Sequence, residues 1–192
     1  MRWVLTGLLL AACGVSEPPA TEERYAALAG APAIQVGAVR TGGFALFRQE
    51  AMRDGRQSYL GPGGVGLVLD RGLIIASRGT PDALMAVEVE GLHAALRQTT
   101  GGETLRRHWY LTGTNENEEL ALTCAVRPMG PREVRIGGGT VPAHLMVERC
   151  DGVNVIENLY WLGRDGDILQ SRQWIGPRTG ALSTRLTRRP AR

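Results

Sequence analysis

The feature that most constrains the fold is a run of short strand-like segments in the second half of the chain. Apolar and polar residues alternate in them, and turn-forming residues such as Gly, Pro, Asn and Asp separate them. The predicted strands are 104–112, 119–127, 133–137, 140–150, 153–162, 167–175 and 181–188, with predicted turns at Asn115-Glu116-Asn117, Gly130-Pro131, Gly137-Gly138-Gly139, Asp151-Gly152 and Asp165-Gly166. These connections are too short for helical crossovers, so the strands form an antiparallel meander.

The first half of the chain mixes strands with short helices. Its predicted strands are 34–39, 44–49, 56–61, 66–70 and 73–77, with tight turns at Asp54-Gly55 and Arg71-Gly72. A short helix is predicted over 21–29, with Thr21 as its N-cap. Another is predicted from Thr80-Pro81-Asp82 to about Val87, because Pro follows a capping residue. The pattern leaves 91–98 unassigned.

Alternation within the strands indicates one curled sheet over one core. One face is shared by Leu120, Leu122, Cys124 and Val126. Further along, Val134 and Ile136 point to the face opposite to that of Glu133 and Arg135. The chain of 192 residues, 43% apolar and 21% charged, suits a single globular domain. The predicted fold class is therefore mainly β, an antiparallel meander curled into a barrel-like or half-barrel sheet with one to three short helices.

The N-terminus predicts export. Residues 1–12 read MRWVLTGLLLAA, in which Arg2 precedes an apolar stretch too short to span a membrane. The following Leu10-Ala11-Ala12-Cys13 resembles the lipobox of bacterial lipoproteins, in which the cysteine thiol accepts a diacylglycerol. We therefore expect a signal peptide over 1–12 and lipidation of Cys13. The alternative is an ordinary secretory signal with a chance cysteine.

Lipidation would determine where the domain works. Residues 13–30 are then a lipidated tether and short helix, and 31–192 a β-rich periplasmic domain. Acyl chains such as palmitate contribute about 0.8 kcal/mol of membrane binding per buried CH₂, so two or three chains hold firmly. Residue 14 is Gly rather than Asp, and by resemblance to enteric lipoproteins this predicts the periplasmic face of the outer membrane.

The two remaining cysteines, Cys124 and Cys150, are predicted to pair. An exported domain meets an oxidising compartment, where thiols form disulfides. The alternative is two buried free thiols.

Composition and motifs argue against several functions. All 22 basic residues are arginine, but the net charge is only +3 and no nucleic-acid motif accompanies it, so we expect no nucleic-acid partner. His93, His108 and His144 lack the spacing of a metal site, and His108 is interpreted as surface or structural. We find no catalytic constellation and expect no cofactor, no metal and no enzymatic activity.

A candidate binding strip lies on the hairpin around Asp165-Gly166. A type I′ turn there would place Asn158 opposite Gln173 and Tyr160 opposite Ser171. These polar residues would share a face on a hairpin that also carries Trp161 and Trp174. Amides beside aromatic rings suit sugar binding, because amides bind hydroxyls and rings stack on pyranose faces. The alternative is that both tryptophans are core and the amides bind backbone.

The same residues carry a family resemblance. Asn158-Leu159-Tyr160-Trp161, Ser171-Arg172-Gln173-Trp174-Ile175-Gly176-Pro177 and the closing segment Leu186 to Pro190 resemble the C-terminal signature of the YjbF/GfcB family, the group 4 capsule polysaccharide lipoproteins. The segment from Leu73 to Arg78-Gly79, followed by Asp82-Ala83-Leu84, is similar to that family's central part, and Cys150 after Glu148 also fits. The resemblance covers roughly 35–190.

The resemblance implies a β-rich lipoprotein encoded with polysaccharide export machinery. The leading hypothesis is a non-enzymatic, lipid-anchored module that assists exopolysaccharide or capsule secretion or assembly by binding the polymer or an export protein. A second hypothesis is a lipid or lipoprotein carrier, which a continuous apolar cavity would favour over a polar groove. A third is a polysaccharide-modifying enzyme, which would need two acids, or a base and a nucleophile, converging in a cleft.

Overall fold

A computed structural model describes residues 20–97, 101–111, 113–114, 116–152 and 155–188. Twelve strands dominate it: β1 (Ala33–Ala38), β2 (Phe44–Arg53), β3 (Arg56–Leu60), β4 (Gly66–Asp70), β5 (Leu73–Arg78), β6 (Ala83–Glu90), β7 (Gly102–Leu111), β8 (Asn117–Ile136), β9 (Gly139–Asp151), β10 (Ile156–Leu162), β11 (Ile168–Gly176) and β12 (Gly180–Leu186). The helices are α1 (Thr21–Ala27), α2 (Leu92–Arg97) and the short 3₁₀ turn η1 (Pro62–Gly64). Within the described residues, neither α-helix is long and apolar enough to cross a membrane.

The strands form one antiparallel sheet in the order β5-β4-β3-β2-β1-β12-β11-β10-β9-β8-β7-β6. Every neighbour in this order is also consecutive along the chain, except that β1 pairs with β12. In the described part of the chain β5 and β6 share no ladder, so the sheet is a barrel that stops short of closure at this seam. The predicted meander, curled into a barrel-like sheet, is confirmed.

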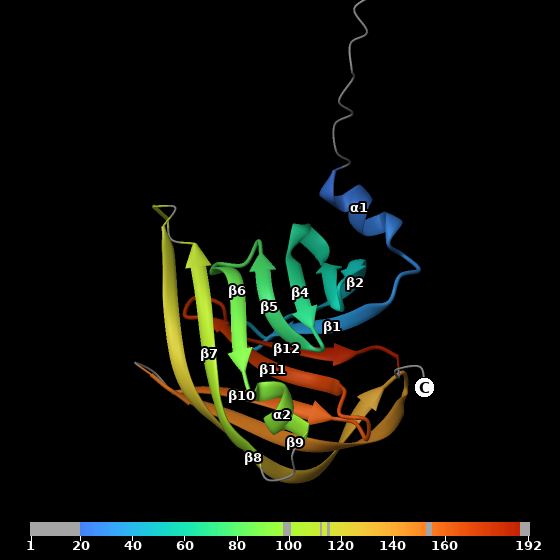
Figure 1. Cartoon of the computed structure of the whole chain (residues 1–192). Coiled ribbons are helices and arrows are strands. Elements are labelled where there is room, and N and C mark those ends of the chain that lie inside the picture. Colours follow the sequence, from blue (N-terminus) through green and yellow to red (C-terminus); the bar gives the residue numbers. More distant parts are fainter. Residues whose placement is uncertain (1–19, 98–100, 112, 115, 153–154, 189–192) are drawn as a thin grey trace, which may run out of the picture.

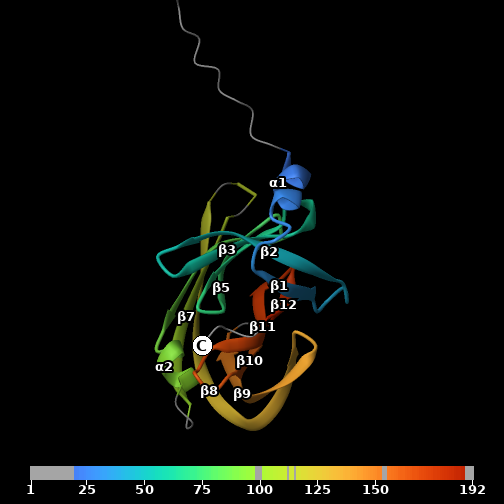
Figure 2. The ribbon, with the colours of Figure 1, turned by 90° about the vertical axis from the view of Figure 1, so that its right-hand side faces the viewer.

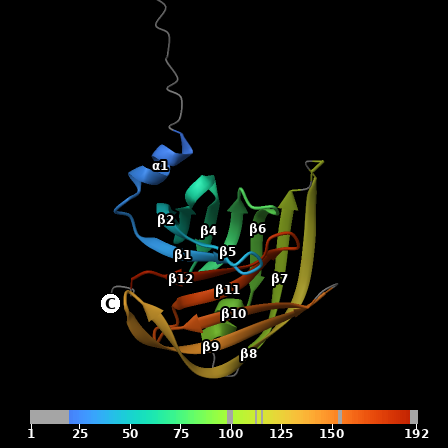
Figure 3. The same cartoon turned by 180° about the vertical axis from the view of Figure 1, so that it is seen from behind.

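The sheet curls over on itself, so that its two halves face each other with their strands running in different directions. In Figure 1, β4 to β7 run upright in front, whereas β10 to β12 and β1 run across behind them. The long strands β8 and β9 sweep from one direction to the other, and Figure 2 shows them curving around the lower end. The short helix α1 lies at the opposite end from α2 (Figure 3). Leu92, Ala95 and Leu96 are the buried residues of α2, and they pack into the core.

The predicted turn at Gly130-Pro131 is wrong, because β8 continues through it. Both halves of β8 pair with β9, from Cys124 opposite Cys150 to Val134 opposite Val141. The ladder only shifts register between Pro128 and Pro131, where Gly130 adopts a left-handed φ of 84°. A bulge of this kind bends a strand without reversing it. The glycine therefore marks a bend in the curled sheet.

The predicted helix over 80–87 is also wrong. Residues Ala83–Glu90 form β6, which pairs with β7, while α2 begins at Leu92. Thr80 does not cap a helix, since its hydroxyl binds the carbonyl of Asp82. Ladder pairing to β7 outweighs the local start signal, as tertiary context commonly does. At the N-terminus, Ala20 rather than Thr21 occupies the cap position of α1, and no side chain caps that helix.

Two predicted hairpin turns are confirmed. Asp54 and Gly55 have φ values of 51° and 77°, and Arg71 and Gly72 have values of 47° and 86°. Two successive positive φ values are the requirement of a type I′ turn. The face shared by Leu120, Leu122, Cys124 and Val126 is also confirmed, since Leu120 is half-buried and the other three are buried. These elements position the site residues on the inner face of the barrel.

Candidate functional site

The hairpin of β10 and β11 has the predicted register with a different turn. Tyr160 pairs with Ser171, as predicted. The loop itself closes around residues 164–166, where the amide of Gly163 binds the carbonyl of Asp167. This loop is longer than the predicted two-residue turn, and a register shift between Trp161 and Leu162 restores the pairing. The polar strip therefore faces one side of the sheet, and that side is the barrel interior.

The strip is part of a buried ion-pair network. Glu148 on β9 is fully buried and accepts hydrogen bonds of 2.8 Å from Arg106, Asn158 and Tyr160. Arg106 on β7 also donates to the Tyr160 hydroxyl over 2.9 Å. The Asn158 side-chain oxygen accepts the backbone N–H of Trp174 over 2.7 Å. Asn158 and Tyr160 are therefore engaged by protein groups in the core.

His108 extends this network toward the hairpin tryptophan. Its ring stacks on Trp174 with centroids 5.6 Å apart, and its Nδ1 lies 2.8 Å from the Tyr110 hydroxyl. Its Nε2 lies 3.5 Å from Arg106, which can only donate, so Nε2 is the acceptor and Nδ1 carries the proton. Burial, together with the Arg106 charge, lowers the pKa of His108 to about 3. His108 is therefore neutral and structural.

Gln173 on β11 links its strand to the start of β5 across the barrel interior. Its side-chain oxygen accepts the backbone N–H of Ile74 over 3.0 Å, and its nitrogen donates to the carbonyl of Gly72 over 2.9 Å. A side-chain amide here replaces the peptide group that a neighbouring strand would supply to β5. Its nitrogen also donates to Ser171, whose hydroxyl meets Thr184 at 2.7 Å. Gln173 thus covers part of the edge at the open seam.

Asp82 connects the two segments that carry the family resemblance, the central segment that contains it and the C-terminal segment that ends at Pro177. Its buried carboxylate accepts the backbone N–H of Thr179 over 2.6 Å and that of Arg178 over 3.1 Å, just after Pro177. It also lies 3.5 Å from the Arg178 guanidinium. Burial raises the pKa of Asp82, but the hydrogen bonds from Thr179 and Arg178 outweigh it and leave the pKa below its ordinary value. Gly176 is required beside it, because a Cβ there would lie 2.4 Å from the carboxyl carbon.

The remaining predicted residues lie apart from this interior network. Arg78 is exposed and reaches Glu50 over 3.4 Å, and Gly79 has a left-handed φ of 68° in the turn after β5. Trp161 is half-buried and packs with a cluster that contains Val134 and Leu169. Pro177 is exposed. The structure therefore brings Asp82 to the turn after Pro177, and Asn158, Tyr160 and Trp174 to the ion-pair network. Gln173 binds Gly72, Ile74 and Ser171 instead, so the nine residues do not form one site.

Sequence reasoning missed the charged centre of the network. Thr104, Arg106, His108 and Tyr110 alternate along β7 and all point inward. Polar residues at every second position of a strand are a detectable signal, but the pattern alone does not say which face is inside. Glu148, which binds Thr104 and Arg106, lies 42 residues further along the chain than Arg106.

The predicted disulfide between Cys124 and Cys150 is present and joins directly paired positions of β8 and β9. The ligand atoms of Glu148 and both cysteines lie within 4.8 Å of one another, a spacing that suits a metal ion. Both sulfurs are already bonded to each other, however, and Glu148 is held by Arg106. This group therefore fits a structural role better than a metal centre.

The burial of neutral His108 makes the stability of the fold depend on pH. The unfolded state has the ordinary pKa of 6.5 whereas the native pKa is about 3, so below pH 6.5 the unfolded state binds the proton first. Acidification from pH 6.5 to 4.5 should lower the free energy of unfolding by about 2 kcal/mol, measured by urea denaturation. This window lies above the range in which Asp82 titrates.

His93 supplies the control for this pH dependence of stability, because its pKa is also lowered. Burial, with a contribution from the Arg71 charge, lowers the pKa of His93, which is only half-buried on α2. His108→Gln should flatten most of the pH dependence, and His93→Gln should leave most of it. An equal slope in wild type and His108→Gln would contradict the assignment.

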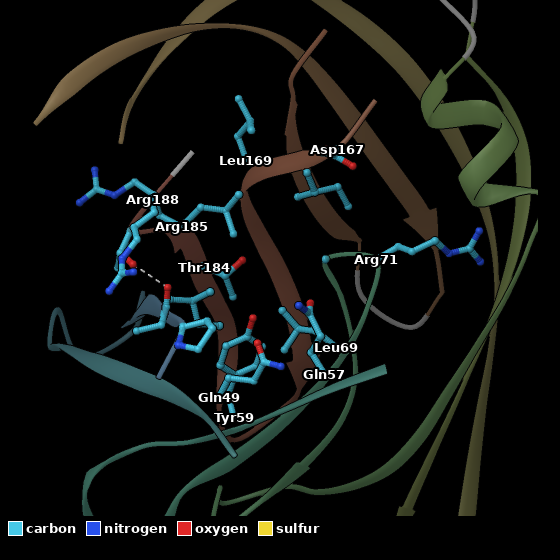
Figure 4. A pocket seen from close by; sticks show the side chains of 17 residues that line it. Gln49, Gln57, Tyr59, Leu69, Arg71, Asp167, Leu169, Thr184, Arg185 and Arg188 are labelled. Atoms are coloured by element: carbon cyan, nitrogen blue, oxygen red, sulfur yellow. Dashed lines mark hydrogen bonds between the residues drawn. The ribbon is translucent and has the colours of Figure 1, made fainter. Parts of the chain in front are cut away.

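The described residues also line a half-open cavity of about 430 Å³ (Figure 4). Its walls come from strands β1 to β4, from the Arg71-Gly72 turn, from the start of β11, and from the end of β12 together with the residues that follow β12. Gln49, Gln57 and Tyr59 lie together on one side, and Thr184 lies near them (Figure 4). Asp167 is the acidic residue among the described lining residues. The predicted binding hairpin contributes only its loop end to this space.

Comparison with known proteins gives a family and a fold. A family model described as group 4 capsule polysaccharide lipoprotein, GfcB and YjbF, matches residues 18–186. The hypothetical lipoprotein YmcC from Escherichia coli has a similar solved structure, with a TM-score of 0.73, 17% identity, and coverage of 90% of this chain and 89% of that chain. No curated protein matches the chain.

Two further solved structures align less closely. An exported protein of Bacteroides fragilis with a YmcC-like fold has a TM-score of 0.38 and 10% identity, and covers 82% of this chain and 93% of its own. A lipoprotein of Parabacteroides distasonis has a TM-score of 0.40 and 9% identity, with 82% and 92% covered.

Proposed function

This chain belongs to the family of group 4 capsule polysaccharide lipoproteins, and from that membership we propose that it assists the secretion or assembly of a capsule or exopolysaccharide. The observation that carries the proposal is the match of the family model over 18–186, which spans nearly the whole described domain. A barrel-like fold shared with the lipoprotein YmcC is consistent with it. The partner is the polymer itself or a protein of the export machinery.

We further propose a lipid anchor at Cys13, which lies outside the described residues. The support is the apolar segment 1–12 directly before Leu10-Ala11-Ala12-Cys13. Gly14 in place of Asp favours the periplasmic face of the outer membrane. Anchoring matters physically, because it holds the domain next to the membrane that the polymer must cross and raises its local concentration there.

Binding is a better-supported role than catalysis. The carboxylate of Glu148 has no access to a substrate, since it is fully buried and hydrogen-bonded on every side by Arg106, Asn158 and Tyr160. Asp82 is likewise buried and committed to the amides of the Pro177 turn. A lipid-carrier role would need a continuous apolar cavity through the barrel, whereas the buried pair of Arg106 and Glu148 occupies part of the interior.

The test is polysaccharide output from the host bacterium after deletion of the gene. Output should fall in the deletion strain and recover with the wild-type chain. Cys13→Ser should fail to restore it and should take up no labelled palmitate, whereas the matched variant Val15→Ala keeps the thiol and should restore it. Immunoblots confirm equal protein amounts, and membrane fractionation checks the outer-membrane location. Normal output in the deletion strain would refute the proposed role, and full recovery with Cys13→Ser would refute the need for an anchor.

A further inference from the structure

The half-open cavity of Figure 4 presents polar groups that the protein itself leaves unused. Tyr59 is only 4% exposed, yet within the described chain its hydroxyl makes no hydrogen bond to another protein group. The side-chain amides of Gln49 and Gln57 are also without a protein partner among the described residues. Gln49 and Gln57 are half-buried and the Tyr59 hydroxyl is not enclosed, so all three groups can bind a partner from outside the chain.

The Tyr59 side chain lines the cavity, and its hydroxyl is not sealed in the core. No side-chain nitrogen or oxygen atom in the described residues is both enclosed and unpaired, so this hydroxyl is accessible, and Tyr59 lines both this cavity and a smaller hollow beside Glu50 and Arg78. Burial of its ring raises the pKa of Tyr59, so the hydroxyl stays protonated and can both donate and accept. It is therefore available to a ligand in the cavity.

Strand register places the three groups side by side. Gln49 on β2 pairs directly with Tyr59 on β3, and Gln57 precedes Tyr59 by two residues on the same face. Figure 4 shows them gathered on one side, with the Thr184 side chain nearby. The two amides and the hydroxyl supply donors and acceptors on one wall of the cavity, which is the pattern that vicinal hydroxyl groups require.

The other walls of the cavity are aliphatic. Ile34, Leu69, Leu169 and Leu186 line it, so a ligand would also meet apolar surface. A pyranose ring has both features, because its hydroxyls project around the rim while its C–H groups form apolar faces. An acyl chain would bury the amides of Gln49 and Gln57 without hydrogen bonds, which is costly. The volume of about 430 Å³ lies within the range of small-molecule sites.

The charges around the cavity do not favour an anionic ligand. Arg71 and Arg188 extend away from the glutamine and tyrosine cluster in Figure 4. Arg185 is directed to the side chain of Gln35. Asp167 adds a carboxylate, which accepts hydrogen bonds from hydroxyl groups and repels anions. These charges match an uncharged ligand rich in hydroxyl groups.

We propose that this cavity binds a neutral hexopyranose unit, with Gln49, Gln57 and Tyr59 as its hydrogen-bonding residues. The inference rests on the proposed role in polysaccharide secretion or assembly, and it names the class of sugar and the site. It moves the binding site from the inner face of the β10–β11 hairpin, where Asn158 and Gln173 are engaged by the protein, to the wall formed by β2 and β3.

The test is saturation-transfer NMR on the full chain in lipid nanodiscs, with the methyl glycosides of glucose, galactose and mannose as probes. At least one glycoside should bind the wild-type chain. Gln57→Leu and Tyr59→Phe, which remove hydrogen-bonding groups at nearly constant volume, should each weaken that binding at least about tenfold. Methyl glucuronoside should bind less well than the neutral glycoside of the same ring, because Arg71 and Arg188 extend away from the glutamine and tyrosine cluster and Arg185 is bound to Gln35.

Matched controls make the same chemical changes elsewhere. Tyr25→Phe removes a hydroxyl that binds the carbonyl of Leu46 on the outside of the barrel, and Gln170→Leu changes a half-buried residue outside this cavity. Both should bind the glycoside as the wild type does. Thermal unfolding of each variant verifies that the barrel is intact.

Three results would overturn the inference: no transfer from any glycoside, equal binding by wild type and both cavity variants, or binding of dodecanoate in place of the sugars. Each is separable from the proposed function. If output falls on gene deletion but no glycoside binds, only the sugar site is wrong. If glycosides bind but output is unchanged on deletion, the proposed role fails and the site stands as a sugar site of other use.

Discussion

Replacing Glu148 with Gln is expected to lower the free energy of unfolding by about 3–5 kcal/mol, because it leaves the Arg106 guanidinium buried without its counter-charge. Arg106 is 2% exposed and its Nη2 lies 2.8 Å from the Glu148 carboxylate, so water cannot replace the lost partner. The amide introduced by Glu148→Gln would also set its NH2 group against a donor in either orientation, because Arg106 Nε donates to one carboxylate oxygen and Asn158 and Tyr160 donate to the other. Urea denaturation followed by circular dichroism measures the change.

A surface pair supplies the matched control for this substitution. Glu90 is exposed and accepts a hydrogen bond of 3.1 Å from Arg107 on the neighbouring strand. Glu90→Gln should cost less than about 1 kcal/mol, since solvent screens an exposed pair. The double variant Arg106→Met with Glu148→Leu removes both charges and should be more stable than Glu148→Gln alone. A loss at Glu148→Gln no larger than at Glu90→Gln would show that the carboxylate is not buried against Arg106.

Removal of the disulfide is expected to cost about 3–4 kcal/mol of unfolding free energy. Cys124 and Cys150 are separated by 26 residues, and on the chain-entropy model a loop of this size restricts the unfolded chain by that amount. Both cysteines are buried, so alanine is the suitable replacement because it introduces no hydroxyl group into the core. The midpoint of urea denaturation of Cys124→Ala/Cys150→Ala, compared with the wild type, measures the effect.

Reduction provides an independent arm of the same experiment. Dithiothreitol should lower the denaturation midpoint of the wild type toward that of the double alanine variant, and should leave the variant unchanged. A wild-type midpoint that does not respond to complete reduction would show that the bond contributes no stability. The Glu148 and disulfide effects need not add, because Glu148 and Cys150 lie two residues apart on β9 and share the surrounding packing.

Much of the fold was predictable because it depends on local signals. The turn at Arg71-Gly72 and the pairing of Tyr160 with Ser171 follow from residues close together in the chain. The inward face of β8 follows from simple alternation. In contrast, the segment 80–87 carries a local helix-start signal but becomes β6, because pairing with β7 satisfies its backbone. Likewise Gly130 bends β8 instead of ending it, since both halves find the same partner strand.

The candidate site was less predictable because its meaning depends on distant partners. Asn158 and Gln173 were placed correctly on one face, but whether that face is open or buried depends on the closure of the whole barrel. The closure adds Arg106 from β7 and Glu148 from β9 to the hairpin and commits its amides to protein groups. Conversely, Gln49, Gln57 and Tyr59 carry no distinctive pattern along the chain and become a group only through the ladder of β2 and β3.

Linear patterns were enough to establish the class of sheet, most of its turns, the pairing of its cysteines and the family, because each of these follows from nearby residues or from a motif read along the chain. Which polar residues are buried in ion pairs, and which face an open cavity, became apparent only in the folded barrel. That distinction depends on the exposure of each side chain, and exposure is set by strands that meet across the barrel from opposite ends of the chain.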